Sequence, residues 1–205
     1  RQMCIRDSLR HHLAAPEAGF QGRSRCRAQR CLTPRRGGCA IPSPPMPHAS
    51  FHTPLGPMTV FERDGAVVAL EWGEAPPDGA ATPLLRRAVG QLQDYFDGTR
   101  DAFDLPLAPQ GTPFQRRVWD ALCRIPPGET RSYAEIGREV GCRAARAIGQ
   151  ANGRNPIPIL IPCHRVVAAD GSLGGYSGGE GPATKRYLLQ LERRATAAPR
   201  GGSFP

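Results

Sequence analysis

The spacing of apolar and polar residues divides the chain into an unpatterned beginning and a patterned remainder. Residues 1–45 show no sustained period of 2 or 3.6 residues and contain few large apolar side chains. Such a segment cannot bury enough apolar surface to offset its conformational entropy. We therefore predict that residues 1–45 are a disordered or non-native basic tail, with Met46 as a candidate native start. Residues 196–205 are predicted to be a second disordered tail.

Regular patterning between residues 46 and 108 predicts a small α/β subdomain. Two runs rich in β-branched and aromatic residues, Met58–Arg63 and Ala66–Trp72, flank an Asp-Gly pair and indicate a β-hairpin. Apolar residues then recur at helical spacing over Pro83–Phe96, which predicts a helix with one buried face. Phe103–Leu107 is predicted to be a short strand. Because this part carries no recognisable chemistry, we expect it to support the rest of the chain.

Residues 109–195 carry a mostly helical pattern. One helix is predicted from Phe114 to Arg124, with a threonine cap and a proline at its first position. Two short helices, Tyr133–Val140 and Ala144–Asn152, surround a glycine in the manner of a helix-turn-helix. A terminal helix is predicted over Pro182–Arg194. The predicted fold is therefore α/β, with a small N-terminal α/β subdomain of hairpin plus helix, followed by a mostly helical subdomain with a helix-turn-helix.

Charge alone does not identify a nucleic-acid-binding protein here. The formal net charge is +9, but residues 1–45 hold nine arginines against two acidic residues, or +7, which leaves +2 for the remainder. A DNA-binding face therefore has to come from local arginines, such as Arg143, Arg146 and Arg154 on the second helix of the predicted helix-turn-helix. By itself that motif is more typical of an ordinary helical hairpin with solvated arginines.

The densest cluster of reactive side chains is Cys163-His164-Arg165. It follows the apolar run Ile157–Ile161, which is bracketed by prolines and predicts a short buried strand or extended segment. A thiol reacts as its thiolate, and a nearby base or cation lowers its pKa. Neighbouring side chains of an extended segment point to opposite faces, so His164 needs a bridging water or a turn imposed by Pro162 to act on the sulfur. A buried structural cysteine beside an ion-paired His-Arg is the other interpretation.

Cysteine usage and hydropathy bound the compartment and the cofactors. Seven cysteines without a regular framework predict a reducing, cytoplasmic environment. No apolar run reaches the roughly 20 residues of a membrane helix, so no membrane partner is expected. The spacing of Cys26, Cys31 and Cys39 matches no zinc pattern. We expect no metal and no organic cofactor.

The stretch Asn155–Val167, with the glycine-rich Gly174–Gly179 after it, resembles the active-site segment of the 6-O-alkylguanine-DNA alkyltransferases (methylated-DNA–protein-cysteine methyltransferases), whose signature is Pro-Cys-His-Arg. The resemblance is clearest from Thr112 to Glu192, weaker from Ser50 to Leu107 and absent from 1–45. It implies a monomeric DNA-repair protein. Such a protein transfers the alkyl group from 6-O-alkylguanine in double-stranded DNA to its own cysteine, irreversibly and without a cofactor.

The resemblance also implies a role for individual residues. Cys163 would accept the alkyl group, and His164 would activate it through a water while Glu192 orients the imidazole. Tyr133 would donate a proton or hydrogen bond to the guanine ring, and Lys185 completes the implied catalytic set.

The implied binding residues surround a nucleotide flipped out through the minor groove. Arg146 would fill the gap in the base stack, and Ser177 would donate from its backbone to the 6-oxygen. Carbonyls at Cys163 and Val166 would read the exocyclic amine. The complete implied set for substrate and DNA is Arg146, Asn155, Arg165, Val166, Tyr176 and Ser177.

Two other functions stay open on the sequence. One is a helix-turn-helix protein that senses damaged DNA without transfer, although such sensors replace the nucleophilic cysteine. The other is a cysteine hydrolase that uses Cys163 and His164 over many turnovers, although no oxyanion hole is recognisable in the sequence.

Overall fold

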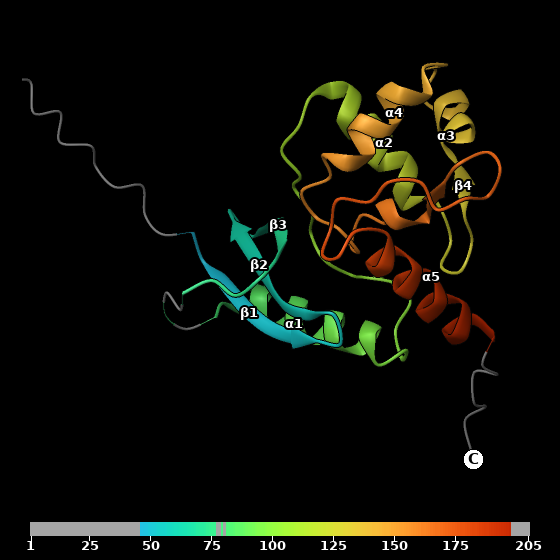
Figure 1. Cartoon of the computed structure of the whole chain (residues 1–205). Helices are drawn as coiled ribbons and strands as arrows, with labels where there is room; N and C mark the ends of the chain where they lie inside the picture. The colour runs from blue at the N-terminus through green and yellow to red at the C-terminus, as the bar shows by residue number, and fades with distance from the viewer. Residues whose placement is uncertain (1–45, 77–78, 80, 198–205) are drawn as a thin grey trace, which may run out of the picture. The chain divides into compact units, whose positions relative to one another are not determined.

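The computed structural model describes residues 46–76, 79 and 81–197 (Figure 1). The predicted tail 1–45 lies outside these residues, and with it the cysteines considered for zinc. Of the predicted C-terminal tail, only residues 196 and 197 are described. They continue the last helix, so that helix is longer than its apolar pattern predicted.

Three antiparallel strands form a sheet in the order β1-β2-β3, namely His48–Thr53, Gly56–Arg63 and Ala66–Trp72. The predicted hairpin is β2-β3. Asp64 and Gly65 both have positive φ, 52° and 77°, as a tight hairpin turn requires. Strand β1 extends the predicted hairpin by one strand. Its pattern is weak because only Phe51 among its six residues is buried.

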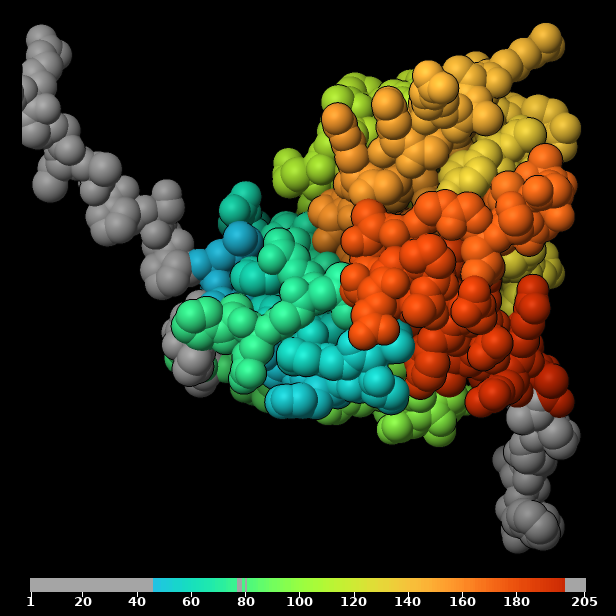
Figure 2. Space-filling view, in the orientation of Figure 1, coloured from blue at the N-terminus to red at the C-terminus, as the bar shows by residue number. Residues whose placement is uncertain are grey.

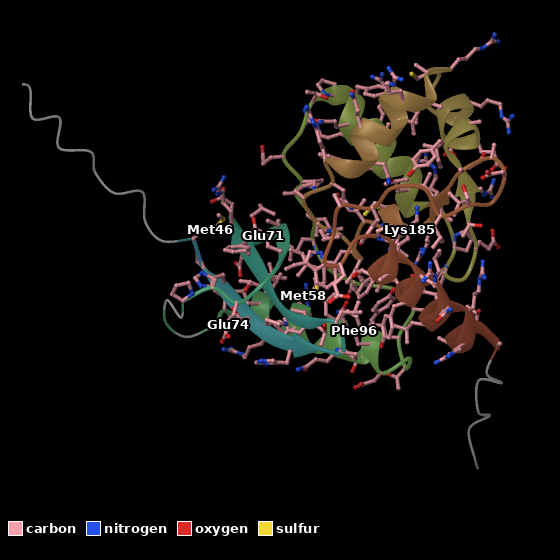
Figure 3. All side chains as sticks on the ribbon, viewed as in Figure 1. Met46, Met58, Glu71, Glu74, Phe96 and Lys185 are labelled. Atoms are coloured by element: carbon pink, nitrogen blue, oxygen red, sulfur yellow. The ribbon has the colours of Figure 1, made fainter. Side chains whose placement is uncertain are left out.

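Helix α1, Pro83–Phe96, has the predicted bounds and covers the sheet. Thr82 caps it by accepting a hydrogen bond from the Leu85 amide. Met58 and Phe96, both labelled in Figure 3, are buried in the core between the sheet and α1. The strand predicted at Phe103–Leu107 is reduced to a single bridge between Leu107 and Val67.

The helical part begins with α2, Pro113–Cys123, capped by Thr112. A two-residue strand, β4 (Arg131–Ser132), leads into α3, Tyr133–Glu139, and α4 follows at Ala145–Gly153. The predicted helix-turn-helix is therefore present as α3 and α4.

Close packing explains the shape of the turn between these two helices. A Cβ on Gly137 would lie 2.4 Å from the Cys142 carbonyl oxygen, so a side chain there would force the turn away from α3. The Trp119 indole N–H of α2 donates to the Ala151 carbonyl at 2.9 Å, which ties α4 to α2. This fixes the second helix of the motif on the core.

The run Ile157–Ile161 is a buried turn, so its prediction as a strand or extended segment was wrong. The Ile161 amide donates to the Ile157 carbonyl at 2.9 Å, and Ile159 has a φ of 72°. A 3-10 turn, η1 (Cys163–Arg165), follows directly. The prolines that bar a helix also remove ladder donors, so the chain folds back on itself instead of pairing as a strand.

The chain then pairs β5, Val166–Val167, in parallel with β4, and ends in α5, Pro182–Ala197. The loop between them lies against β3 (Figure 2), where a Cβ on Gly178 would come within 2.7 Å of the Trp72 indole nitrogen. The predicted α/β fold class, with an N-terminal sheet and helix followed by a helical part, is confirmed. Across the described residues, no helix has the length and hydropathy needed to cross a membrane.

Candidate active site

Cys163 begins the 3-10 turn η1, and two asparagines hold its backbone and the turn before it. The Asn155 side chain donates to the Ile161 carbonyl at 2.7 Å and accepts from the Ile157 amide at 3.0 Å, so it closes the buried turn before the cysteine. Asn152, at the end of α4, donates to the Cys163 carbonyl at 3.2 Å. These bonds place the cysteine against the helix-turn-helix, and Asn155 holds the turn before it.

Two hollows meet at Cys163. The first, of about 490 Å³, runs from Cys163 to Tyr133 and is called the Tyr133 hollow. The second, of about 350 Å³, runs from Cys163 to the end of β3 and is called the Trp72 hollow. Asn152, Gly153, Tyr176 and Ser177 line both. The predicted residues Tyr133, Tyr176 and Ser177 are thus brought together around the cysteine.

His164 and Glu192 form the predicted hydrogen-bonded pair, and both side chains are buried. The His164 Nε2 lies 2.7 Å from Glu192 Oε1, and the two side chains are 0% and 2% exposed. Glu192 comes from α5, so the pair joins η1 to the last helix. Because an ionised carboxylate only accepts hydrogen bonds, the imidazole proton belongs on Nε2. The other ring nitrogen, Nδ1, then carries a lone pair, and it makes no hydrogen bond to any described residue.

The ionisation of this pair follows from its neighbours. Burial alone would raise the pKa of Glu192, but hydrogen bonds from His164 and Arg165 and the charge of Arg165 hold its pKa well below the usual carboxyl value. Burial lowers the pKa of His164, and Glu192 offsets only part of that effect. At neutral pH the pair is therefore a carboxylate and a neutral imidazole whose free nitrogen can act as a base.

The thiol does not have the lowered pKa that its neighbours in sequence predicted. Burial raises the pKa of Cys163 above its ordinary value, and the Asn155 and Tyr176 side chains and the Lys185 charge offset only part of the rise. Arg165 is adjacent in sequence, but its guanidinium is turned to Glu192. The resting cysteine is therefore a thiol, and a base has to take its proton during the reaction.

Arg165 was predicted to bind substrate or DNA, and the structure places it elsewhere. The side chain is buried and donates to both Glu192 oxygens, with N–O distances of 2.9 Å to each. It also donates to the Ile125 carbonyl at 2.5 Å. A guanidinium that is only 5% exposed and holds a carboxylate in a bidentate contact is not presented to DNA. Arg165 therefore holds Glu192 in place.

Lys185 and Val166 also differ from the predicted arrangement. Lys185 is the only lysine of the chain, lies on α5 (Figure 3) and is 0% exposed. Its ammonium donates to the Val166 carbonyl at 2.5 Å and to the Leu173 carbonyl. Neither Lys185 nor Val166 lines a hollow. The Val166 carbonyl predicted to read a base thus already has a partner, and Lys185 ties the loop after β5 to α5.

Lys185→Met tests this structural role. The variant keeps the length of the side chain but leaves two carbonyls without their buried donor, so we expect it to lower the free energy of unfolding by about 2–4 kcal/mol. Urea denaturation measures the change. Arg186→Met, one residue along α5 and exposed, is the matched control and should change stability by less than about 0.5 kcal/mol. Equal stability of Lys185→Met and the native chain would contradict the role.

Two partners of Glu192 were missed by the sequence analysis. The Tyr95 hydroxyl of α1 donates to Glu192 Oε1 at 2.9 Å, and the Gly128 amide donates to Oε2 at 3.1 Å. Tyr95 lies in the Pro83–Phe96 helix, for which the apolar pattern predicted only a buried face. A hydroxyl on that face was the one available signal, since a buried tyrosine usually finds a hydrogen-bond partner.

Arg146 is exposed near the beginning of α4, with Arg143 exposed just before the helix and Arg154 just after it. The Ser177 hydroxyl donates to the Gly153 carbonyl at 3.3 Å, which brings the glycine-rich loop to the end of the same helix. Gly149 and Gly153 of α4 line the Tyr133 hollow. The same helix therefore carries exposed arginines and forms one wall of the hollow.

The comparisons with known proteins cover both parts of the fold. Residues 46–109 match the family model of the 6-O-methylguanine DNA methyltransferase ribonuclease-like domain, and residues 113–194 match that of the DNA binding domain of the same proteins. The chain belongs to the 6-O-methylguanine DNA methyltransferase family.

Individual relatives of this family agree over most of their length. The constitutive methylated-DNA–protein-cysteine methyltransferase of Bacillus subtilis is 44% identical over 157 residues, 71% of this chain and 94% of the relative. The enzyme of that name from Methanosarcina barkeri is 46% identical over 150 residues, 69% of this chain and 94% of the relative. The crystal structure of Mycobacterium tuberculosis OGT in complex with DNA is similar with a TM-score of 0.67 and 45% identity, and the match covers 75% of this chain and 95% of that one.

Proposed function

We propose that this protein repairs DNA by transferring the alkyl group of 6-O-alkylguanine to Cys163, irreversibly and once per molecule. The observation that carries the proposal is the position of Cys163. Its thiol lies where the Tyr133 hollow ends, next to a buried His164–Glu192 pair and beside the helix-turn-helix. Family membership and the relatives named methylated-DNA–protein-cysteine methyltransferase support the same activity.

The first step is the removal of the thiol proton. The Nε2–H of His164 donates a hydrogen bond to Glu192, so the lone pair on Nδ1 is available as a base. A bridging water would carry the proton from the Cys163 thiol to Nδ1. The 3-10 turn at Cys163–Arg165 replaces the extended geometry that would have directed the two side chains to opposite faces. The base is needed because burial keeps the cysteine protonated at rest.

The second step is an in-line displacement at the alkyl carbon. A bond forms between the sulfur and that carbon, the bond from the carbon to the guanine 6-oxygen breaks, and its electron pair stays on the guanine. Burial raises the pKa of Tyr133, with a smaller contribution from Cys163, so its hydroxyl remains a donor at neutral pH. Tyr133 can then give a proton or hydrogen bond to the leaving base, while a Ser177 amide donates to the oxygen.

The product is a thioether, which water does not displace, so each molecule would act once. A buried thiol cannot reach a stacked base, and the guanine would have to be flipped out of the duplex. In this proposal, α4 enters the minor groove and Arg146 takes the place of the flipped base. Asn155 serves the reaction by holding the turn before the cysteine.

The decisive experiment incubates the protein with duplex DNA that contains 6-O-methylguanine and locates the methyl group by peptide mass spectrometry. We expect one methyl group on the peptide that contains Cys163 and unmodified guanine in the DNA. Binding of that DNA without label on the protein would support the damage sensor instead. Release of product well beyond one equivalent would support the hydrolase.

Arg146→Ala should separate base flipping from chemistry. An arginine that only stabilises the flipped state affects duplex substrates, because unstacking costs a few kcal/mol and each 1.4 kcal/mol is tenfold in rate. We expect transfer from duplex DNA to slow by about 10²-fold, while the reaction with free 6-O-benzylguanine changes by less than about twofold. Rate constants for both substrates are measured at limiting substrate concentration.

The matched control for this variant is Arg193→Ala, which removes an exposed arginine from α5 instead of α4. It should leave both reactions nearly unchanged. Equal losses on duplex DNA and on the free base in Arg146→Ala would point to a defect in the hollow rather than in flipping.

A further inference from the structure

The Glu192 carboxylate accepts hydrogen bonds from the N-terminal and the helical parts of the fold. The bond from α1 has no role in the function proposed above. The carboxylate accepts from His164 and Arg165 of η1, from the Gly128 amide, and from the Tyr95 hydroxyl of α1. Tyr95 is 97 residues from Glu192 in sequence and only 2% exposed. This bond therefore connects the sheet-and-helix part directly to the candidate relay.

Tyr95 and His164 share the same oxygen. The Tyr95 hydroxyl lies 2.9 Å from Oε1 and the His164 Nε2 lies 2.7 Å from it. Arg165 donates to both oxygens, and the Gly128 amide donates to Oε2. Each donor to an anionic oxygen draws negative charge toward itself, so donors that share one oxygen weaken each other. The geometry therefore makes Tyr95 a competitor of the imidazole for the Glu192 charge.

We propose that Tyr95 is a positioning residue for alkyl transfer, whose hydroxyl limits how strongly Glu192 draws a proton onto His164 and so keeps the imidazole available as a base. This inference rests on the proposed function, because it concerns the same relay. It also assigns chemistry to the N-terminal part of the fold, which the sequence analysis had treated as support only.

The charges around His164 are few enough that the Tyr95 hydroxyl can change the proton affinity of the imidazole. From α5 it faces Glu192 and Lys185, and from its own turn it faces Arg165. The two cations and burial oppose its protonation, and Glu192 alone favours it. With both side chains of the pair buried, solvent does not screen a change in the charge that Oε1 presents.

Tyr95 itself keeps its proton throughout the working range. Burial raises its pKa well above the usual phenol value, and the Glu192 charge raises it further, with Arg165 opposing. Tyr176 contributes a weaker effect in the same direction. The hydroxyl is therefore a donor at every pH at which transfer can be measured, and its effect on His164 does not itself titrate away.

Tyr95→Phe removes the hydroxyl and keeps the ring, which packs edge-on against Phe96 and tilted against Phe103, with centroids 5.5 Å apart in each case. The rate constant for reaction of the protein with free 6-O-benzylguanine is measured from pH 5.5 to 9. Freed from its competitor, Glu192 should raise the proton affinity of His164. We expect the acidic limb of the profile to move upward by about half a pH unit, which is about a threefold lower rate below the limb and no change above it.

Phe103→Leu is the matched control, because it disturbs the packing of the Tyr95 ring and leaves the hydroxyl in place. It should lower the melting temperature without moving the limb. The proposal is overturned if Tyr95→Phe slows the reaction equally at every pH, leaves the limb in place, or shifts it no more than the control does.

A second readout separates this proposal from the proposed function. The His164 imidazole can be titrated by NMR in the native chain and in Tyr95→Phe, with no substrate present. An upward shift in the variant supports the role of Tyr95 even if the DNA experiment finds no transfer. A titration that stays unchanged or moves downward rejects it even if Cys163 is alkylated as proposed.

Discussion

Cys163→Ala is expected to abolish alkyl transfer completely and to leave binding of DNA containing 6-O-methylguanine intact or slightly tighter. The substitution removes the only sulfur that lines the Tyr133 and Trp72 hollows of the described structure, while the exposed arginines of α4 are unchanged. Transfer is measured as methyl groups per protein at long times with substrate in excess, and binding by titration of labelled duplex at a stated salt concentration. The native protein should reach a plateau near one.

Cys123→Ala and Cys142→Ala are the matched controls for this prediction. Cys123 is exposed at the end of α2, and Cys142 is half-buried in the turn of the helix-turn-helix. Although the residue is exposed, neighbouring atoms partly desolvate its thiol, and this desolvation and the Asp120 charge raise the pKa of Cys123. The exposure therefore does not make it a good nucleophile. Both variants should keep the plateau near one. Residual methylation of Cys163→Ala would show that another residue is the acceptor.

Glu192→Gln should cause the largest loss of stability of any single substitution in the site. Glu192 is the carboxylate partner of the buried Arg165, and removal of one partner leaves an uncompensated buried charge. We expect a loss of about 3–5 kcal/mol in the free energy of unfolding at pH 7, together with a drop of about 10²-fold in the transfer rate. Urea denaturation and single-turnover kinetics measure the two effects.

The pH dependence of this stability has a definite sign. The folded-state pKa of Glu192 is lowered, so its carboxylate stabilises the protein fully above the ordinary carboxyl pKa, and that contribution is lost as the pH falls toward the folded-state value. The stability difference between the native chain and Glu192→Gln should therefore be full at pH 7 and shrink below about pH 4.

The double variant Arg165→Met/Glu192→Gln keeps this prediction testable if the single variant does not fold. With both charged side chains replaced, no unpaired cation remains in the interior, and a large part of the stability should return. Transfer should stay slow, because the carboxylate that orients His164 is still absent. A double variant that is less stable than Glu192→Gln would mean that Arg165 does not act through Glu192.

Local signals in the sequence were sufficient for most of the secondary structure. The Asp64-Gly65 turn, the Thr112 cap and the bounds of α1 depend on residues within about one helical turn of each other, and all were predicted. The cap of α3 is equally local, because the Ser132 side chain accepts from the Glu135 amide. Such features need no distant partner, because the backbone groups they satisfy lie next to them in the chain.

Features that depend on distant partners were not predictable in the same way. The Ile157–Ile161 run looked like a strand because its apolar residues are continuous, but no strand in the described fold pairs along it, and it closes on itself through Asn155. Continuous apolar runs indicate burial and leave open which backbone groups will be paired.

The sequence by itself determined the family resemblance, the order of the helices, the β2-β3 hairpin, and the presence of Cys163, His164 and Glu192. Only the tertiary structure decided that Arg165 faces Glu192, that Tyr95 reaches the same carboxylate, and that the resting cysteine is a thiol. The reason is physical. Hydrogen-bond partners of a buried charge and the desolvation of a thiol are set by which segments fold against them, and those segments here lie up to 97 residues away.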